Sequence, residues 1–96
     1  MTITTAGGYA GAHVRVDGLT GPDTITYHVY SPTAGVKVMP FATDPLWHNW
    51  FVPQMTLAKG WNTLRWRVPS AIGTVRDLGL QVNLWTGTLY MDTVSW

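Results

Sequence analysis

The sequence predicts an all-β fold, an antiparallel two-sheet sandwich of about seven or eight strands. Glycine, proline and threonine interrupt the chain at short intervals, and apolar and polar residues alternate between these interruptions. No stretch of useful length carries the 3.6-residue apolar stripe of a helix. We expect one domain over residues 1–96, without an internal repeat or a linker.

Four segments carry the alternation typical of half-buried strands, in which every second residue faces the core. The fourth segment is the clearest, and it places Gln81, Asn83 and Trp85 together on the side opposite its aliphatic residues. The residues expected to face the core are, in chain order, Val14 and Val16; Ile25, Tyr27 and Val29; Leu64, Trp66 and Val68; and Leu78, Leu80, Val82 and Leu84.

Six tryptophans in a chain of 96 residues exceed what one small core is expected to bury. Alternation places Trp66 in the core, away from any ligand. Trp61 follows the turn at Gly60, and we expect it to pack under the neighbouring loop. Trp96 ends the sequence and has no assigned face.

The segment after Pro45 carries two further tryptophans, Trp47 and Trp50, with His48 and Asn49 between them. Residues three apart cannot point the same way in a regular strand. If the segment is extended, at most one of these indoles is in the core, and if it is a loop, both can be exposed. With Trp85, these two are the tryptophans that we expect to be available to a partner.

Charge indicates a neutral partner. Six Lys and Arg against five Asp and Glu give a net charge of +1, and the basic residues are scattered, unlike those of nucleic-acid or anionic-membrane binders. No apolar run is long enough to span a membrane. Exposed indole rings beside Gln and Asn suit a β-linked sugar, because its ring faces are apolar and its rim carries hydroxyls.

Three blocks in the C-terminal half, residues 60–69 (GWNTLRWRVP), 75–83 (VRDLGLQVN) and 87–96 (GTLYMDTVSW), resemble the closing strands of the jelly-roll carbohydrate-binding modules of plant-cell-wall glycoside hydrolases. Residues 7–16 (GGYAGAHVRV) are similar to the glycine-rich approach to an early strand of these modules. The resemblance implies a jelly roll that binds a glucan chain along a groove on its concave face. It also places Gln81 and Asn83 on the strand that supplies hydrogen-bonding amides.

We therefore expect a non-catalytic module that holds a β-1,4-linked glucan, such as cellulose chains or xyloglucan, for a covalently linked catalytic domain. Its mechanism is proximity, because it raises the local concentration of substrate. The resemblance implies an extracellular protein, secreted as part of a larger enzyme. The expected sugar-binding residues are Trp47, His48, Asn49, Trp50, Gln81, Asn83 and Trp85, with Tyr30 and His28 on an adjoining strand.

The resemblance also implies a structural calcium site, because relatives ligate calcium with the acidic residue that matches Asp92. The carbonyl groups near Gly7, Gly8 and Gly11 are the candidate partners. Calcium takes six to eight oxygen ligands, and few acids lie near Asp92 in the sequence. The alternative role of Asp92 is that of a solvated residue on a strand.

The residues alone also bear on two other functions, catalysis and protein binding. Glycoside chemistry uses a pair of carboxylates, whereas the five acids here are scattered aspartates and the three histidines form no catalytic or metal-binding pattern, so we do not expect an enzyme. A protein-interaction β-sandwich remains open, because exposed tryptophan, tyrosine and arginine are also typical of protein interfaces.

Overall fold

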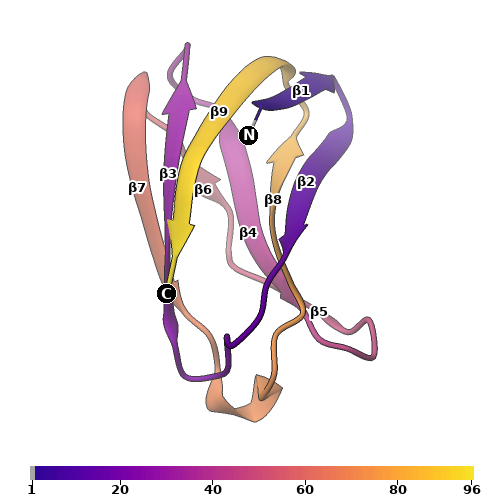
Figure 1. Cartoon of the computed structure of the whole chain (residues 1–96). Helices are drawn as coiled ribbons and strands as arrows, with labels where there is room; N and C mark the ends of the chain where they lie inside the picture. The colour runs from indigo at the N-terminus through magenta and orange to yellow at the C-terminus, as the bar shows by residue number, and fades with distance from the viewer. Residues whose placement is uncertain (1) are drawn as a thin grey trace.

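The computed structural model describes residues 2–96, and of Tyr9, Ala10 and Thr93 it describes the backbone alone. Nine strands in this part of the chain form a four-stranded and a five-stranded sheet that pack face to face (Figure 1). A short 3-10 helix, η1 (Ser70–Ile72), precedes β8. The strands are β1 (Thr2–Ala6), β2 (Tyr9–Arg15), β3 (Thr24–Ser31), β4 (Lys37–Thr43), β5 (Asn49–Phe51), β6 (Met55–Thr56), β7 (Gly60–Arg67), β8 (Asp77–Asn83) and β9 (Thr86–Ser95).

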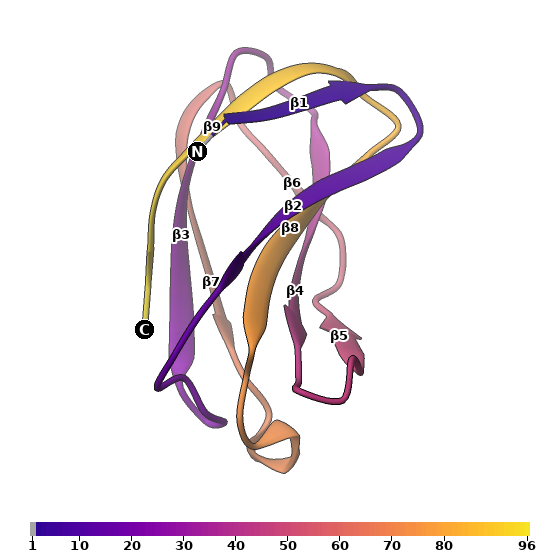
Figure 2. The ribbon, with the colours of Figure 1, turned by 45° about the vertical axis from the view of Figure 1, so that its right-hand side comes forward.

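The strand order is that of a jelly roll, which confirms the predicted fold class. The four-stranded sheet has the order β1-β9-β3-β7, and the five-stranded sheet has the order β2-β8-β4-β5, with β6 also paired to β4. All pairs are antiparallel, and the pairing is nested: β1 with β9, β2 with β8, β3 with β7 and β4 with β5. The chain is thus a long hairpin rolled into two layers (Figure 2), and residues of the edge strands β7 and β5 border a common cavity.

The core lies between the sheets and is built from the residues that alternation assigned to it in β3 and β8. Their side chains are almost completely buried because each strand turns every second residue toward the opposite sheet. Within residues 2–96 the structure contains no helix with the length and hydropathy needed to span a bilayer. The core residues contributed by these two strands are Ile25, Tyr27, Val29, Leu78, Leu80 and Val82.

Tyr27 links the two layers. Its hydroxyl donates a hydrogen bond of 3.2 Å to the carbonyl oxygen of Gly79 in the opposite sheet. Burial raises the pKa of the Tyr27 phenol to about 12, because the phenolate would lose its hydration. The bond fixes the position of β8 relative to β3, and β8 carries the side chains described below as the candidate site.

The end of β8 departs from the prediction. The strand stops at Asn83, and Leu84 adopts a positive φ of 51° while its amide donates a 2.6 Å hydrogen bond to the Gly8 carbonyl. Leu84, expected in the core, is 68% exposed, and Trp85 packs against the core instead of sharing the face of Gln81. The prediction for these two residues was wrong because one left-handed residue reverses the alternation.

Strand β7 contains the two tryptophans that the sequence predicts to be packed inside, Trp66 and Trp61. Trp66 does face inward and packs against the core, although its position near the end of an edge strand leaves it only half-buried. Trp61 is 62% exposed, so the expectation that it packs under the neighbouring loop was wrong. Its ring lies instead on the outer surface of the sheet against Tyr30 of β3.

Candidate functional site

The outer face of the five-stranded sheet carries a chain of three amide side chains. Gln81 and Asn83 share this face, as the alternation in β8 predicted, and Gln81 Nε2 donates a 2.8 Å hydrogen bond to Asn83 Oδ1. Asn83 Nδ2 donates in turn to Gln54 Oε1 at 3.1 Å, which connects β8 to the segment between β5 and β6. Each amide has two donor hydrogens and an oxygen with two lone pairs, so these two bonds leave further donors and acceptors.

Two phenyl rings lie beside the amides on the same face. Phe41 of β4 is paired with Phe51 of β5, and the ring centroids are 5.3 Å apart with an interplanar angle of 38°. On its other side Phe41 pairs with Gly79 of β8, and its ring occupies the space that a side chain at Gly79 would need. The side chain of Phe51 is 46% exposed. We refer to Phe41, Phe51, Gln54, Gln81 and Asn83 as the amide–ring face.

Sequence reasoning missed both phenylalanines. The run over residues 38–42 is apolar on both sides, so alternation within it does not tell which residues face outward. In the structure Val38, Pro40 and Ala42 are buried, whereas Met39 and Phe41 face outward. The signal that could have revealed this is Gly79, because a glycine inside a regular strand marks a close approach by another group.

Polar groups occupy the other end of this face. Thr43 Oγ1 donates a 2.6 Å hydrogen bond to Asn49 Oδ1, and beside Thr43 the carboxylate of Asp77 is buried. One guanidinium nitrogen of Arg76 and Nδ1 of His13 lie 3.7 Å from different oxygens of Asp77, and its Oδ2 accepts no hydrogen bond from the described residues. Along β8 the seven residues from Asp77 to Asn83 span about 20 Å, which is long enough for a short linear ligand.

The loop between β4 and β5 is closed by Asp44. Its Oδ1 accepts hydrogen bonds from the amides of Leu46 (2.9 Å) and His48 (2.8 Å), and its Oδ2 lies 3.0 Å from His48 Nδ1. Burial raises the pKa of the Asp44 carboxyl, but the hydrogen bonds and the charge of His48 outweigh it, so the net pKa lies below its usual value. The loop is therefore held by an ionised carboxylate.

Trp47 is exposed at the tip of this loop. It has a positive φ of 65°, which is rare for a bulky residue, costs about 1–3 kcal/mol and persists only where the surroundings enforce it. The hydrogen bonds of Asp44 enforce it here, and the Arg76 guanidinium carbon lies 3.8 Å from the centre of the indole. One face of the indole is thus supported by a cation, and the side chain stays 63% exposed.

Acid should loosen this loop. A carboxyl whose pKa is lowered in the folded state contributes stability above its unfolded pKa of about 3.9, and that contribution is lost as the pH falls through the folded pKa. We expect thermal unfolding of Asp44→Asn to depend less on pH below about pH 4 than that of the parent chain. Asp17→Asn, at an exposed position, is the control. Equal pH dependence of the parent and Asp44→Asn would contradict the assignment.

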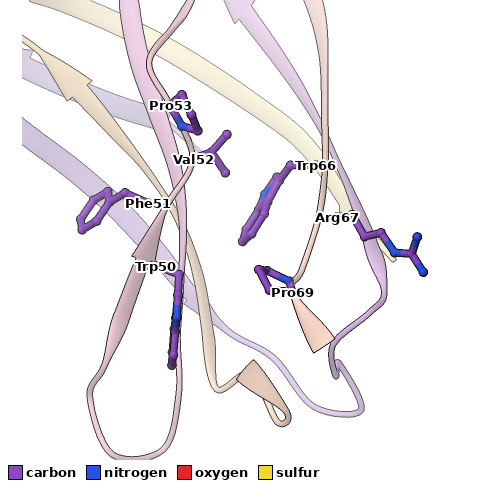
Figure 3. Close-up of a pocket in the computed structure, with 7 residues that line it drawn as sticks. All are labelled: Trp50, Phe51, Val52, Pro53, Trp66, Arg67 and Pro69. Carbon is purple, nitrogen blue, oxygen red and sulfur yellow. The ribbon is translucent and has the colours of Figure 1, made fainter. Parts of the chain in front are cut away.

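Trp50 lies in β5 but faces the opposite side from Phe51, toward a cavity of 280 Å³ between the two edge strands (Figure 3). The indoles of Trp50 and Trp66 both border this cavity, whereas the Arg67 side chain points away from it and Arg67 Nε donates to the Pro22 carbonyl at 3.2 Å. The cavity is mostly apolar and lacks the converging polar groups of a specific ligand pocket. Its lining residues are Trp50, Phe51, Val52, Pro53, Trp66, Arg67 and Pro69.

The structure brings together only part of the predicted sugar-binding set. Gln81, Asn83 and Asn49 are on the outer face of the five-stranded sheet, and the loop with Trp47 and His48 joins the end of that face. His28 and Tyr30 were expected on a strand next to that of Gln81. This prediction was wrong, because they lie on β3, which belongs to the other sheet. Trp50 and Trp85 pack against the core.

The residues implied for calcium do not form a site. Gly7 lies beyond the Ala6–Thr86 pair at the β1–β2 turn, whereas exposed Asp92 is six residues past Thr86 along β9, a distance of about 20 Å. Gly11 belongs to the other sheet. Within residues 2–96 no three His, Cys, Asp or Glu side chains gather where they could hold a metal ion. The expected partners of Asp92 therefore do not fit calcium.

Comparison of the chain with protein-family models, with curated proteins and with solved structures finds no match.

Proposed function

We propose that this domain binds a neutral linear polysaccharide along the amide–ring face and performs no catalysis. The observation that carries the proposal is the placement of Gln81, Asn83 and Gln54 beside the Phe41–Phe51 ring pair on one outer sheet face. A β-1,4-linked glucan, such as a cellulose chain or xyloglucan, is the ligand class that fits best. In a larger enzyme the domain would keep an attached glycoside hydrolase close to its substrate.

The rings and the amides of this face match the two kinds of surface on a sugar ring, its apolar faces and its hydroxyl rim. Exposed Phe51 offers an apolar surface to the C–H groups of a pyranose face, with Phe41 packed behind it. Gln81 is half-buried and Asn83 is 8% exposed, and a hydrogen bond between their amides holds both side chains in place. Each amide keeps donors or acceptors that this bond does not use. Side chains ordered before binding lose less entropy when the ligand arrives.

The charged side chains of this face lie at its two ends, with Lys37 at one end and Arg15 beside Asp77 at the other. Exposed Lys37 lies beside Asn83, and its ammonium donates a 2.6 Å hydrogen bond to Thr56 Oγ1. Asp77, at the other end, is buried next to Arg76 and His13. Glycoside hydrolysis needs two carboxyl groups on either side of the scissile bond, and on this face Asp77 is the only acid that the structure describes. The arrangement therefore favours binding without chemistry.

Trp47 extends the proposed site. Its loop joins β4 to β5, next to Thr43 and Asn49, and its indole is held in place by Asp44 and Arg76. A bulky residue in a strained backbone conformation that its neighbours enforce is typical of ligand clamps. We place Trp47 as an outer stacking platform at the Asp77 end of the face, where a longer chain would reach it.

The test measures affinity for soluble cello-oligosaccharides and xyloglucan by calorimetry and by retardation in polysaccharide-containing gels. We expect Phe51→Ala and Gln81→Ala each to weaken binding about tenfold, in line with the loss of one stacking ring or one amide. Trp96→Ala removes a similarly exposed ring from another part of the chain and should bind like the parent. Xylan and mannan are the comparison ligands that define specificity.

Two results would overturn the proposal. One is a parent domain that neither releases heat with nor is retarded by any of these polysaccharides. The other is a parent domain that binds them while Phe51→Ala and Gln81→Ala bind equally well, which would move the site elsewhere.

A further inference from the structure

The outer face of the opposite, four-stranded sheet carries a second set of aromatic side chains. Trp61 of β7, Tyr30 of β3 and Tyr90 of β9 are paired in register, so they form a row across three neighbouring strands. The ring centroids of Tyr30 and Trp61 are 5.4 Å apart, and those of Tyr30 and Tyr90 are 6.2 Å apart. We refer to these three residues as the aromatic row.

The aromatic row is open to solvent. Trp61 is 62% exposed and Tyr90 is 49% exposed, whereas the residues that flank Tyr90 in sequence, Leu89 and Met91, are buried in the core. The rings of Trp61 and Tyr90 therefore face away from the core, and each contacts the half-buried ring of Tyr30. A contiguous exposed apolar patch is often functional, whereas scattered exposed apolar side chains are ordinary.

The size of the row argues against a protein partner as its occupant. Aromatic side chains present about 150–250 Å² each, so the exposed parts of Trp61 and Tyr90 offer roughly 250 Å². A stable protein interface buries about 800 Å² on each partner. The row therefore matches a narrow ligand, one chain wide, better than a second copy of the domain.

The neighbours of the row define the chemistry of that ligand. Thr2 pairs with Tyr90, and the hydroxyls of Thr4 and Thr88 lie 3.3 Å apart on the same face. Along β7 the next outward residue after Trp61 is Thr63. The next outward residues on the other two strands are Asp92, which is exposed on β9, and His28 on β3. Apolar rings bordered by hydroxyl, carboxylate and imidazole groups are complementary to a hydroxylated ligand, whose C–H faces are apolar and whose hydroxyls both donate and accept hydrogen bonds.

We infer that the aromatic row is a second polysaccharide-binding surface, so that one domain binds two chains on opposite faces. The two sheets pack face to face, and their outer faces point in opposite directions (Figure 2). A chain on the amide–ring face therefore does not reach the row. The choice of ligand rests on the proposed function, but the row itself is independent of the residues that carry that function. Two sites on opposite faces give the domain the ability to cross-link polymers.

The experiment uses soluble xyloglucan as the probe and light scattering as the measure of cross-linking. We expect the parent domain to increase scattering and the double variant Trp61→Ala/Tyr90→Ala to abolish that increase while still being retarded in a xyloglucan gel. Phe51→Ala should also reduce cross-linking, because it weakens one of the two sites about tenfold. Trp96→Ala is the control for exposed rings, and circular dichroism confirms that each variant is folded.

Each outcome separates the two proposals. If the parent binds xyloglucan without cross-linking it, or the double variant cross-links as well as the parent, the second surface is overturned and the amide–ring face stands. If gel retardation depends on Trp61 and Tyr90 and not on Phe51, the row is the main site and the amide–ring proposal fails. If sedimentation shows a dimer that dissociates in the double variant, the row is a protein interface and the inference is wrong.

Discussion

Replacement of Trp66 by alanine should lower the free energy of unfolding by about 3 kcal/mol, the lower end of the range for large aromatic-to-alanine changes. The indole packs against the core and borders the cavity of 280 Å³, so its removal would enlarge an existing void between the edge strands. Its half-buried position places the expected cost at that lower end. Urea unfolding followed by circular dichroism measures the change.

Trp61→Ala is the matched control, because both tryptophans lie on β7 and face opposite ways. We expect it to change the free energy of unfolding by less than about 0.5 kcal/mol, as for most surface positions. Equal stability of the two variants would show that the inward and outward faces of β7 have been assigned wrongly. The denaturant dependence of both variants should match that of the parent if the unfolded states are similar.

Gly79→Ala should both destabilise the fold and weaken sugar binding. A methyl group at Gly79 would overlap the ring of Phe41 and would also lie 2.7 Å from the carbonyl oxygen of Ala12 in the neighbouring strand. Overpacking of this kind costs about 1–3 kcal/mol. Because the Phe41 ring must move, Phe51 loses its packing partner, and we expect affinity for cello-oligosaccharides to fall about tenfold.

A double-mutant cycle separates the ring from the backbone contact. In the background of Phe41→Leu, Gly79→Ala should cost less stability than in the parent, because the overlap with the ring is gone and only the carbonyl contact remains. Thermal unfolding of the four proteins gives the coupling free energy for stability, and calorimetric titration gives the coupling free energy for sugar binding. Strict additivity would mean that Phe41 does not lie over Gly79 in solution.

Alternation predicted the fold where one side of a strand is apolar and the other is polar. Ile25, Tyr27 and Val29 face the core as expected, and Gln81 and Asn83 share an outer face. The outward position of Phe41 was missed because residues 38–42 are apolar on both sides of β4, and only Lys37 and Thr43 at the strand ends mark the outer side. Alternation therefore identifies the outward side chains of a strand only where the two sides of the strand differ in polarity.

The errors occurred where a local conformation or the choice of sheet decides the outcome. A left-handed Leu84 moved Trp85 to the core side, and no pattern in the sequence required that conformation of a leucine. Tyr30 and Gln81 both face outward, but on opposite sheets, because strands alternate between the layers of a jelly roll. Alternation assigns a residue to the core or to an outer face. Only the long-range pairing of strands determines which of the two sheets carries that outer face.

The nested pairing also has a consequence for the kinetics of folding. The hairpin of β4 and β5 joins Thr43 to Asn49, whereas β1 and β9 join Thr2 to Tyr90 across almost the whole chain. Distant pairings must overcome the entropy of closing long loops, and β-sandwiches therefore fold in about milliseconds to seconds. We expect folding to begin at the hairpin that Asp44 closes and to finish when β1 covers the open edge of β9, an edge that until then can pair with other chains.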